Sequence, residues 1–319
     1  MTGCMDFHRD CRFFLENSIR TRYIRRVTGC SLFRLRFPDP SPNREEKVAV
    51  ITISRGSYSY GKAIAEKVAN RLGYDCIARE VLIEASEEFN IPEIKLFSAI
   101  HDAPSILDRF ISGKEKFIAY IQTALLNYLR KDKVVYHGFG GQFFVESIPH
   151  VLKVRINADL EDRVRLSMDR NNFTRKEAMA FIRKLDNQRK KWSKHLYGVN
   201  PWDNSLYELV IQLGKISQED AVEIICHTAK LDRFKTTPES QRAMEDLYLS
   251  AKVRAALIGK KPDVRVAVQN GEVFIRATAP EAKAFEVNQN IQSIAEKVEG
   301  VRGLKIVIVP VPDYLNHHL

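Results

Sequence analysis

The segment from Gly56 to Lys62 carries residue types and a spacing that bind phosphate groups. It reads Gly56-Ser57-Tyr58-Ser59-Tyr60-Gly61-Lys62 and satisfies the pattern G-x-x-x-x-G-K. In such a loop, backbone N–H groups at the positive end of a helix dipole surround phosphate oxygens, and the lysine ammonium reaches the β and γ phosphates. The competing interpretation is an ordinary glycine-rich turn whose lysine is simply exposed to solvent.

The elements predicted on either side of this loop favour phosphate binding. Residues 48–53 form a β-branched run without polar alternation, which is typical of a strand buried on both faces of a parallel sheet. Apolar residues then repeat at helical spacing from Ile64 to Leu72 and stop at Gly73. We therefore expect a central strand, a phosphate loop and an amphipathic helix in this order.

The residues after Lys62 lack the hydroxyl that normally ligates Mg²⁺ beside such a loop. Ala63 and Ile64 stand where serine or threonine is usual, so metal binding is expected to be weakened or moved. Ser57 and Ser59 are candidate replacements, although a loop serine is more often simply solvated. The sequence therefore names no metal ligand.

Strand and helix patterns alternate through the next part of the chain. Helices are predicted at 80–89, 116–129, 160–170 and 175–194, and strands at 133–136, 151–156 and 208–213. Ser217 and Asp220 resemble a capping box that opens a further helix. This alternation predicts an α/β fold whose parallel sheet is covered by helices on both faces, over residues 47–232.

A second, smaller domain is predicted over residues 245–312, with the boundary near 235–245. Helices are expected over 239–257 and 280–298. Asn270-Gly271 separates two alternating runs, which is the strongest short hairpin signal. A last strand over 304–309 completes a small α+β domain.

Composition limits the class of protein. The 319 residues are 45% hydrophobic and 28% charged, the balance of a globular chain of about two domains, and no apolar run reaches membrane-spanning length. A net charge of +10 favours an anionic partner, or reflects only a basic surface. Five cysteines without C-x-x-C spacing fit a reducing, cytoplasmic compartment.

Residues 1–46 are predicted to be a basic, disordered extension outside the folded core. They contain nine Arg and no Lys and end in a stretch rich in proline. A secretory signal and a transit peptide are both disfavoured, because the segment lacks an uninterrupted apolar region and contains acidic residues. An interaction tail and an extension upstream of the natural start are both open interpretations.

An ordered set of motifs resembles the cytidylate kinase-like family of P-loop nucleoside monophosphate kinases. Residues 51–55, the loop ending in Gly61-Lys62 and the following Ile64-Ala65 resemble the family's opening. Further matches follow in the family's order at Arg79-Glu80, Gly138-Phe139-Gly140-Gly141-Gln142, Leu160 to Arg163, Asp186-Asn187-Gln188-Arg189 and Tyr207 to Ile211. Together they cover about 47–230.

The resemblance implies a P-loop NTPase-type fold, ATP and Mg²⁺ as cofactors, and phosphoryl transfer from ATP to CMP or a similar monophosphate. The donor nucleotide would lie on Gly56, Ser57, Tyr58, Ser59, Tyr60, Gly61, Lys62 and Ala63. Catalysis would fall to Lys62 with three lid arginines, Arg163, Arg183 and Arg189, because arginine binds phosphate oxygens in pairs. The acceptor would contact Arg79, Gly138, Gly140, Gly141 and Asp186. A solvated helical face is the alternative for Arg163, Arg165 and Arg183.

Three departures from the family pattern weaken the enzyme interpretation. Phe139 replaces the arginine of G-R-G-G, Ala78 replaces an acid of the acceptor segment, and Ala63 replaces the loop hydroxyl. Asp75 is a possible substitute carboxylate, although a role in the turn after Gly73 is favoured. The alternative function is therefore a nucleotide-binding protein that turns over poorly.

Two further residues favour structural interpretations. His137 is expected to be a satisfied strand-end histidine, and Trp202 is expected to pack under the lid. The segment 245–312 is similar to a BON domain through its helix, its hairpin and Gly300-Val301 before the last strand. That likeness implies docking to a lipid or protein surface, and no specific nucleic-acid binding is expected.

Overall fold

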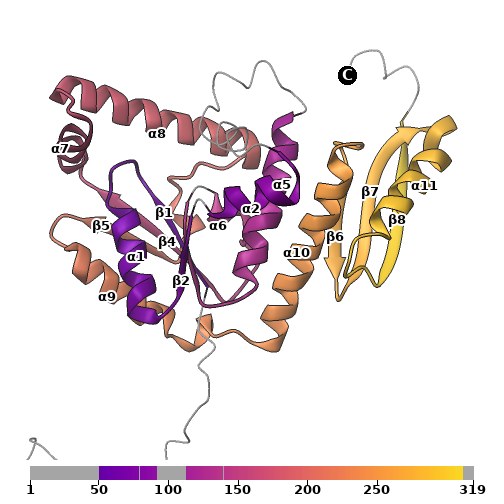
Figure 1. Ribbon diagram of the computed structural model, residues 1–319, viewed down its shortest axis with the longest axis horizontal. Coiled ribbons are helices and arrows are strands. Elements are labelled where there is room, and N and C mark those ends of the chain that lie inside the picture. The colour runs from indigo at the N-terminus through magenta and orange to yellow at the C-terminus, as the bar shows by residue number, and fades with distance from the viewer. Residues whose placement is uncertain (1–49, 79, 92–112, 139, 312–319) are drawn as a thin grey trace, which may run out of the picture. The chain divides into compact units, whose positions relative to one another are not determined.

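A five-stranded parallel sheet forms the first part of the molecule (Figure 1). The computed structural model describes residues 50–78, 80–91, 113–138 and 140–311. The strands are β1 (Val50–Arg55), β2 (Asp75–Ile77), β3 (Val134–His137), β4 (Val151–Ala158) and β5 (Leu209–Leu213). Their order is β2-β3-β1-β4-β5 and every neighbouring pair is parallel. The predicted P-loop NTPase-type architecture and the central position of β1 are confirmed.

Helices cover both faces of this sheet, as predicted. Side chains alternate along each strand, so Ile51 and Ile53 face one layer and Val50 faces the other. The first layer contains α1 (Gly61–Leu72) and α9 (Gln218–Ala229). The second contains α2 (Glu80–Glu88), α5 (Gly113–Leu129) and α6 (Gly141–Phe144). The predicted capping box of Ser217 and Asp220 is present at the start of α9.

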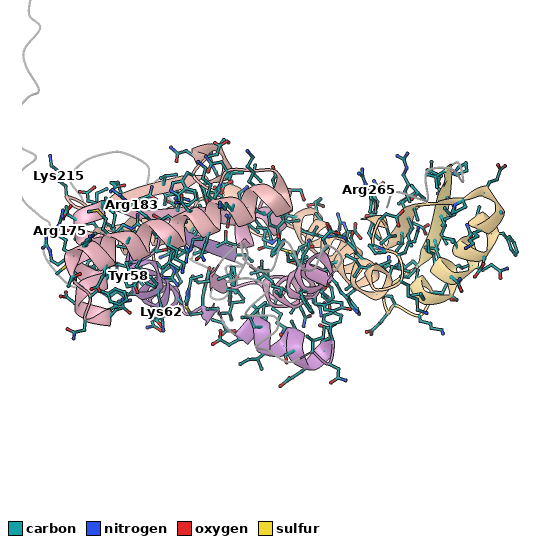
Figure 2. All side chains as sticks on the ribbon, turned by 90° about the horizontal axis from the view of Figure 1, so that it is seen from above. Tyr58, Lys62, Arg175, Arg183, Lys215 and Arg265 are labelled. Carbon is teal, nitrogen blue, oxygen red and sulfur yellow. The ribbon has the colours of Figure 1, made fainter. Side chains whose placement is uncertain are left out.

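Two lid helices lie on the loop side of the sheet. They are α7 (Leu160–Asn171) and α8 (Arg175–Tyr197), and in the view from above α8 is the long helix on which Arg175 and Arg183 are labelled (Figure 2). A small core of their own contains Val164, Ala178 and Ile182. Thr174 opens α8 with a capping box, which fixes the turn between the two helices.

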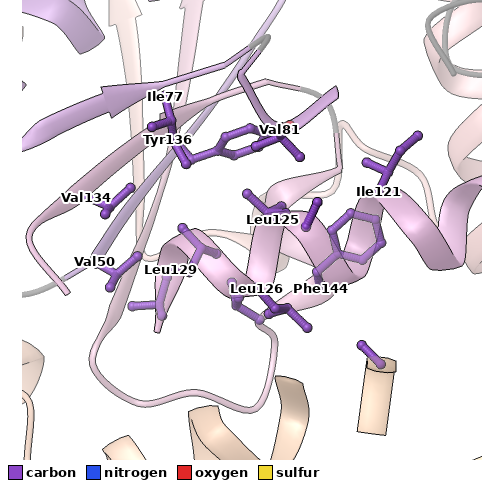
Figure 3. Packing of buried hydrophobic residues seen from close by; sticks show 14 of the residues in the cluster. Val50, Ile77, Val81, Ile121, Leu125, Leu126, Leu129, Val134, Tyr136 and Phe144 are labelled. Atoms are coloured by element: carbon purple, nitrogen blue, oxygen red, sulfur yellow. The ribbon is translucent and has the colours of Figure 1, made fainter. Parts of the chain in front are cut away.

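The second layer of the first sheet has the denser core. Figure 3 shows Leu125 and Leu129 of α5 packed beside Val134 and Tyr136 of β3. Burying such side chains contributes roughly 1.5 to 3 kcal/mol each relative to their exposure. This core fixes β3, and therefore the glycine run that follows it. This core also includes side chains of a helix later in the chain, at residues 238–258.

A three-stranded sheet with helices on one face forms the C-terminal module. Its elements are α10 (Pro238–Ile258), β6 (Arg265–Gln269), β7 (Glu272–Pro280), α11 (Ala284–Ala295) and β8 (Gly303–Val311). Asn270 and Gly271, with φ of 53° and 80°, form the predicted hairpin turn between β6 and β7. The predicted helix over 280–298 is shorter, because β7 extends to Pro280 and a 3₁₀ turn (Glu281–Lys283) precedes α11.

Helix α10 belongs to both cores. Met244 and Ala251 pack in the core of the first sheet, whereas Val253 and Leu257 pack in the core of the second. Phe234, in a 3₁₀ turn before α10 (Asp232–Phe234), is buried on the other face of the first sheet, in the layer of α1 and α9. The boundary near 235–245 and the independence of 245–312 therefore stay predictions, and residues 1–46 lie outside the described part. Within the described part, no helix is long and apolar enough to cross a membrane.

Candidate active site

The loop between β1 and α1 has the geometry of an anion-binding turn. Tyr58 and Tyr60 both take a left-handed conformation with φ of 58°, which curls the backbone. Gly61 is required because a Cβ atom there would lie 2.6 Å from Cδ of Arg55. The first N–H groups of α1 have no acceptor within the helix and carry its positive dipole end. The backbone is therefore arranged to bind phosphate oxygens.

Lys62 lies at the start of α1 with its ammonium available. Its side chain is 65% exposed, and its ion-pair partner is Glu66 at 3.7 Å, one helical turn later. An exposed pair of this kind contributes at most about 1 kcal/mol, so it does not prevent the lysine from binding a phosphate. Figure 2 labels Lys62 and Tyr58, which come from α1 and from the loop before it.

Arg163 connects the lid to the loop. Its Nε donates to the carbonyl oxygen of Ser57 at 2.7 Å, and its Nη2 lies 2.9 and 2.7 Å from the two carboxylate oxygens of Asp186. Both side chains are largely buried, at 12% and 21% exposed. The alternative that Arg163 lies on a helical face exposed to solvent is therefore wrong.

Arg189 is the second lid arginine at the loop. Its Nη1 donates to the carbonyl oxygen of Arg55 at 2.6 Å. Burial, the largest cause, and the cations Arg55, Arg163 and Arg155 together lower the pKa of Arg189 to about 10, although Asp186 opposes them. Among the described residues, three arginines and one carboxylate thus act on the Arg189 guanidinium, which leaves a local excess of positive charge.

The other predicted residues are distributed differently. Arg183 is exposed on α8 (Figure 2) and makes no hydrogen bond or ion pair with the described residues. Arg165 is also exposed and pairs with Asp162 at 3.5 Å. Arg79 and Phe139 lie outside the described residues. The lid contribution described here therefore comes from Arg163 and Arg189.

The glycine run after β3 makes room for an aromatic ring. A Cβ atom at Gly138 would lie 2.1 Å from the hydroxyl oxygen of Tyr136, and one at Gly141 would lie 2.6 Å from its Cδ1. Gly140 has φ of 84° and precedes α6. These glycines are needed for packing and for the turn, whatever they bind in addition.

His137 and Glu80 stand near the predicted acceptor segment. His137 is 7% exposed, and its Nδ1 has no partner in the described part, so the fully satisfied strand-end histidine is not observed. Burial lowers the pKa of His137, and the Arg55 cation lowers it further. The Glu80 carboxylate accepts from the Ala78 N–H at 2.6 Å. Glu80 therefore supplies a carboxylate beside Ala78, whereas Asp75 is exposed in β2.

Glu80 is held in its charged form. Burial, the largest single cause, raises its pKa, but the hydrogen bonds from the amides of Ala78 and Glu80 together with the charges of His137 and Lys62 outweigh burial and lower the pKa. The sequence offered a signal for this residue, since Glu80 follows Arg79 directly in the family-like motif. Arg155 is a further buried cation that the sequence did not indicate, and Trp202 stacks on it at 5.2 Å.

The loop fits nucleotide phosphates better than it fits a protein-bound metal. In the part of the chain with described placement, no group of three or more His, Cys, Asp or Glu is arranged to hold an ion. The Ser59 hydroxyl donates to the Gly56 carbonyl at 2.9 Å. The Ser57 hydroxyl is buried and has no partner among the described residues. The described part of the loop therefore offers backbone amides and an unpaired hydroxyl, groups that suit phosphate oxygens.

Comparisons with known proteins place the chain. It is similar in structure to an uncharacterized protein from Eubacterium ventriosum, at 19% identity and a TM-score of 0.42 over 57% of this chain and 98% of that one. A shikimate kinase from Bacteroides thetaiotaomicron gives 14% identity and a TM-score of 0.38 over 58% and 99%. A gluconokinase from Sinorhizobium meliloti gives 12% and 0.36 over 58% and 95%. No curated protein matches.

The sequence pattern of the cytidylate kinase-like family matches residues 50–215, more than half of the 319 residues. This range contains the loop between β1 and α1, the glycine run after β3, and both α7 and α8. The chain therefore belongs to the cytidylate kinase-like family.

Proposed function

We propose that the protein is an ATP-dependent nucleoside monophosphate kinase that transfers a phosphoryl group from ATP to CMP or a similar monophosphate. The observation that supports this most is that Arg163 and Arg189 bind the carbonyl oxygens of Ser57 and Arg55 at the loop, where the charges of Arg55 and Arg155 also act on Arg189. Two nucleotides bring several negative charges together during transfer, and such a cluster offsets them. Because ATP is the donor, we also propose a cytoplasmic location.

Each chain residue has a defined task in this proposal. The loop amides and Lys62 hold the donor phosphates, and the metal that accompanies ATP supplies further charge neutralisation when bound. Arg163 and Arg189, now bonded to loop carbonyl oxygens, stabilise the transferring group and exclude water under the lid. An acceptor phosphate oxygen forms the new P–O bond while the bond to the ADP leaving group breaks. Glu80 and His137 contact the acceptor.

The departures at Ala78 and Phe139 bear on the rate of this reaction. A ring in place of a cation offers the acceptor phosphate no charge, and one missing charge costs on the order of 10²-fold in rate. Glu80 supplies a carboxylate beside Ala78, which compensates for part of the loss. A binding protein that turns over poorly is the alternative if this compensation fails.

The deciding assay measures ADP release by the purified protein with ATP, Mg²⁺ and a panel of monophosphates. The proposal expects release that depends on a pyrimidine monophosphate and that disappears in Lys62→Ala. Release that is the same without an acceptor would indicate hydrolysis. Tight ATP binding without release under any condition would support the binding alternative.

A second candidate function concerns the uncovered face of the second sheet. Phe274, Val307 and three cations, Arg265, Arg276 and Lys305, are exposed there, and the Lys305 ammonium lies 5.2 Å from the Phe274 ring centre. Cations around apolar side chains suit an anionic lipid surface. This favours the BON-like interpretation of the module and a docking role for it.

Vesicle sedimentation tests the docking role. Full-length protein should bind phosphatidylglycerol vesicles better than phosphatidylcholine vesicles, and Arg276→Glu with Lys305→Glu should abolish the difference. Arg175→Glu is the control, because Arg175 is exposed on α8. Equal sedimentation with both lipids would refute the lipid assignment.

A further inference from the structure

Arg155 is a buried cation whose partners are all neutral in the described part of the chain. It is 3% exposed on β4, and its position pairs with Ser54 of β1 in the sheet register. Nε donates to Asn157 Oδ1 at 2.9 Å, and Nη1 donates to the Pro201 carbonyl oxygen and to the Tyr207 hydroxyl. A buried charge without a counter-charge is costly, so its retention requires a reason.

Apart from Asn157, which is on β4 itself, the partners of Arg155 lie on the segment that returns from the lid. Helix α8 ends at Tyr197, and residues 198–207 lead back to β5. Within this segment, Trp202 lies over the guanidinium with its ring centre 5.2 Å from Cζ, and the Tyr207 ring centre is 5.6 Å away. One arginine therefore holds the return segment by two hydrogen bonds and two ring contacts.

Tyr207 extends the same network to both nucleotide segments. Its hydroxyl lies 3.3 Å from Ser54 Oγ, next to the residue that precedes the phosphate loop, and 2.9 Å from the Pro201 carbonyl oxygen. Gln142, directly after the glycine run, donates to the same hydroxyl at 3.3 Å. The lid exit, the phosphate loop and the acceptor-side glycines thus meet at one buried hydroxyl beside Arg155.

We propose that Arg155 is a positioning residue that fixes the return segment 198–207 and thereby holds Arg189 at the phosphate loop. This inference rests on the kinase function proposed above. The fork of arginine is needed, because a lysine ammonium at the same place lacks the planar surface that stacks on Trp202 and the separate Nε donor that reaches Asn157 while Nη1 reaches Pro201 and Tyr207.

The positive charge of Arg155 also supports phosphoryl transfer, in addition to its contacts with the return segment. Its charge is among those that act on the buried Arg189 guanidinium. It therefore adds to the positive field that receives the transferring phosphate. A neutral side chain of similar volume would remove both the anchor and this charge, whereas lysine would retain the charge alone.

The test uses tryptophan fluorescence together with steady-state kinetics. The protein contains two tryptophans, so Trp192→Phe leaves Trp202 as the single reporter. In this background, Arg155→Met should raise acrylamide quenching of Trp202 at least twofold, with Arg155→Lys intermediate. In the kinase assay, Arg155→Met should lower kcat at least tenfold while the Kd for ATP changes less than threefold. Trp202→Leu, which leaves β4 intact, should lower kcat in the same direction.

Arg175→Met is the matched control, since Arg175 is an exposed arginine at the start of α8 that pairs with Glu161. It should change neither the quenching nor kcat. Unchanged quenching in Arg155→Met would refute the anchor, and raised quenching with kcat within twofold would refute the positioning role. A parent protein without kinase activity would refute the proposed function, and the fluorescence would then decide by itself whether Arg155 holds the return segment.

Discussion

Arg163 holds Asp186 through a single terminal nitrogen, which lies 2.9 and 2.7 Å from the two carboxylate oxygens. Because Nε of the same guanidinium donates to the Ser57 carbonyl, one side chain joins both lid helices to the phosphate loop. In this structure Asp186 thus positions the lid residue Arg163. For the predicted contact with the acceptor, either this ion pair must open or the Asp186 carboxylate must accept from Arg163 and the acceptor at the same time.

Asp186→Asn tests the importance of this pair. The amide keeps the size of the side chain but cannot offset the Arg163 charge, so kcat should fall by about tenfold or more with little change in ATP affinity. Steady-state kinetics and calorimetry measure the two effects. Glu161→Gln is the control, since Glu161 pairs with Arg175 on the exposed surface of the same helices. An equal loss in both variants would contradict a specific role for Asp186.

Lys62→Ala tests the phosphate loop. The substitution should weaken ATP binding by roughly 1.5 to 3 kcal/mol, because it removes a charge-assisted hydrogen bond to phosphate. Lys67→Ala, on the same helix and paired with Glu219, should leave binding unchanged. Titration calorimetry measures the ATP affinity of both variants. Equal ATP affinity in wild type and Lys62→Ala would refute the assignment of residues 56–62 as a phosphate-binding loop.

Phe139→Arg combined with Ala78→Asp tests whether the departures from the family pattern limit the rate. The double variant supplies a cation for the acceptor phosphate and a carboxylate for its polar edge. It should raise kcat/KM for CMP at least about tenfold, which corresponds to ~1.4 kcal/mol.

Glu80→Gln tests whether Glu80 compensates for Ala78 in the wild type or whether the departures at Ala78 and Phe139 limit the rate. If Glu80 compensates for Ala78, this variant should raise KM for CMP in the wild type but have a smaller effect in the double variant. High CMP kinase activity in the unmodified protein would show that other residues recognise the acceptor. Inactivity of every variant with ATP still bound would favour the binding alternative.

His150 makes the stability depend on pH. It is buried before β4, and neither ring nitrogen has a partner in the described part. Burial lowers its pKa, against a smaller opposing effect of Asp132. The unfolded chain, with a histidine pKa of about 6.5, therefore binds more protons than the folded one as the pH falls. The free energy of unfolding should decrease between about pH 7.5 and 5.5.

Urea unfolding at several pH values measures this decrease. His150→Leu should make the decrease in the free energy of unfolding smaller. Part of the decrease should remain, because the pKa of His137 is also lowered. The exposed His227 is the control, and His227→Leu should retain the full decrease. An unchanged slope in His150→Leu would contradict the assignment.

Met244→Ala tests whether α10 makes the two sheets one folding unit. Met244 is fully buried in the first core, so its truncation should lower the free energy of unfolding by roughly 2 to 5 kcal/mol. Far-UV circular dichroism should show a single transition. Arg242→Ala, on the exposed side of the same helix, should change stability by less than about 0.5 kcal/mol. Two separate transitions would instead support an independent C-terminal domain.

The sequence predicted the features that depend on local pattern. The loop, α1 and the Asn270-Gly271 hairpin were visible because turn residues and periodicity lie within a few positions of one another. Strand β2 was missed because it has three residues and begins with the exposed Asp75. The loop contact of Arg189 was anticipated only through the family motif, since its carbonyl partner is 134 residues away.

Other parts of the site depend on contacts between distant segments. Arg155 lies in a buried strand whose pattern gives no reason for a cation, and its partners Pro201 and Tyr207 are 46 and 52 residues away. Periodicity showed that α10 is a helix, but it does not reveal which of two cores each side chain enters. Such assignments follow from tertiary packing, which a single sequence does not specify by pattern.

The division of α10 between two cores has a consequence for synthesis on the ribosome. All five strands of the first sheet emerge before residues 238–258, so the nascent chain first exposes the α5 surface formed by Ala119 and Tyr120. Phe89 stacks on Tyr120, and the cover of that surface is completed when Ala255 and Ile258 arrive. Exposed apolar surface on an incomplete chain favours aggregation. A product that stops before residue 258 would therefore carry a complete phosphate loop on a body prone to self-association.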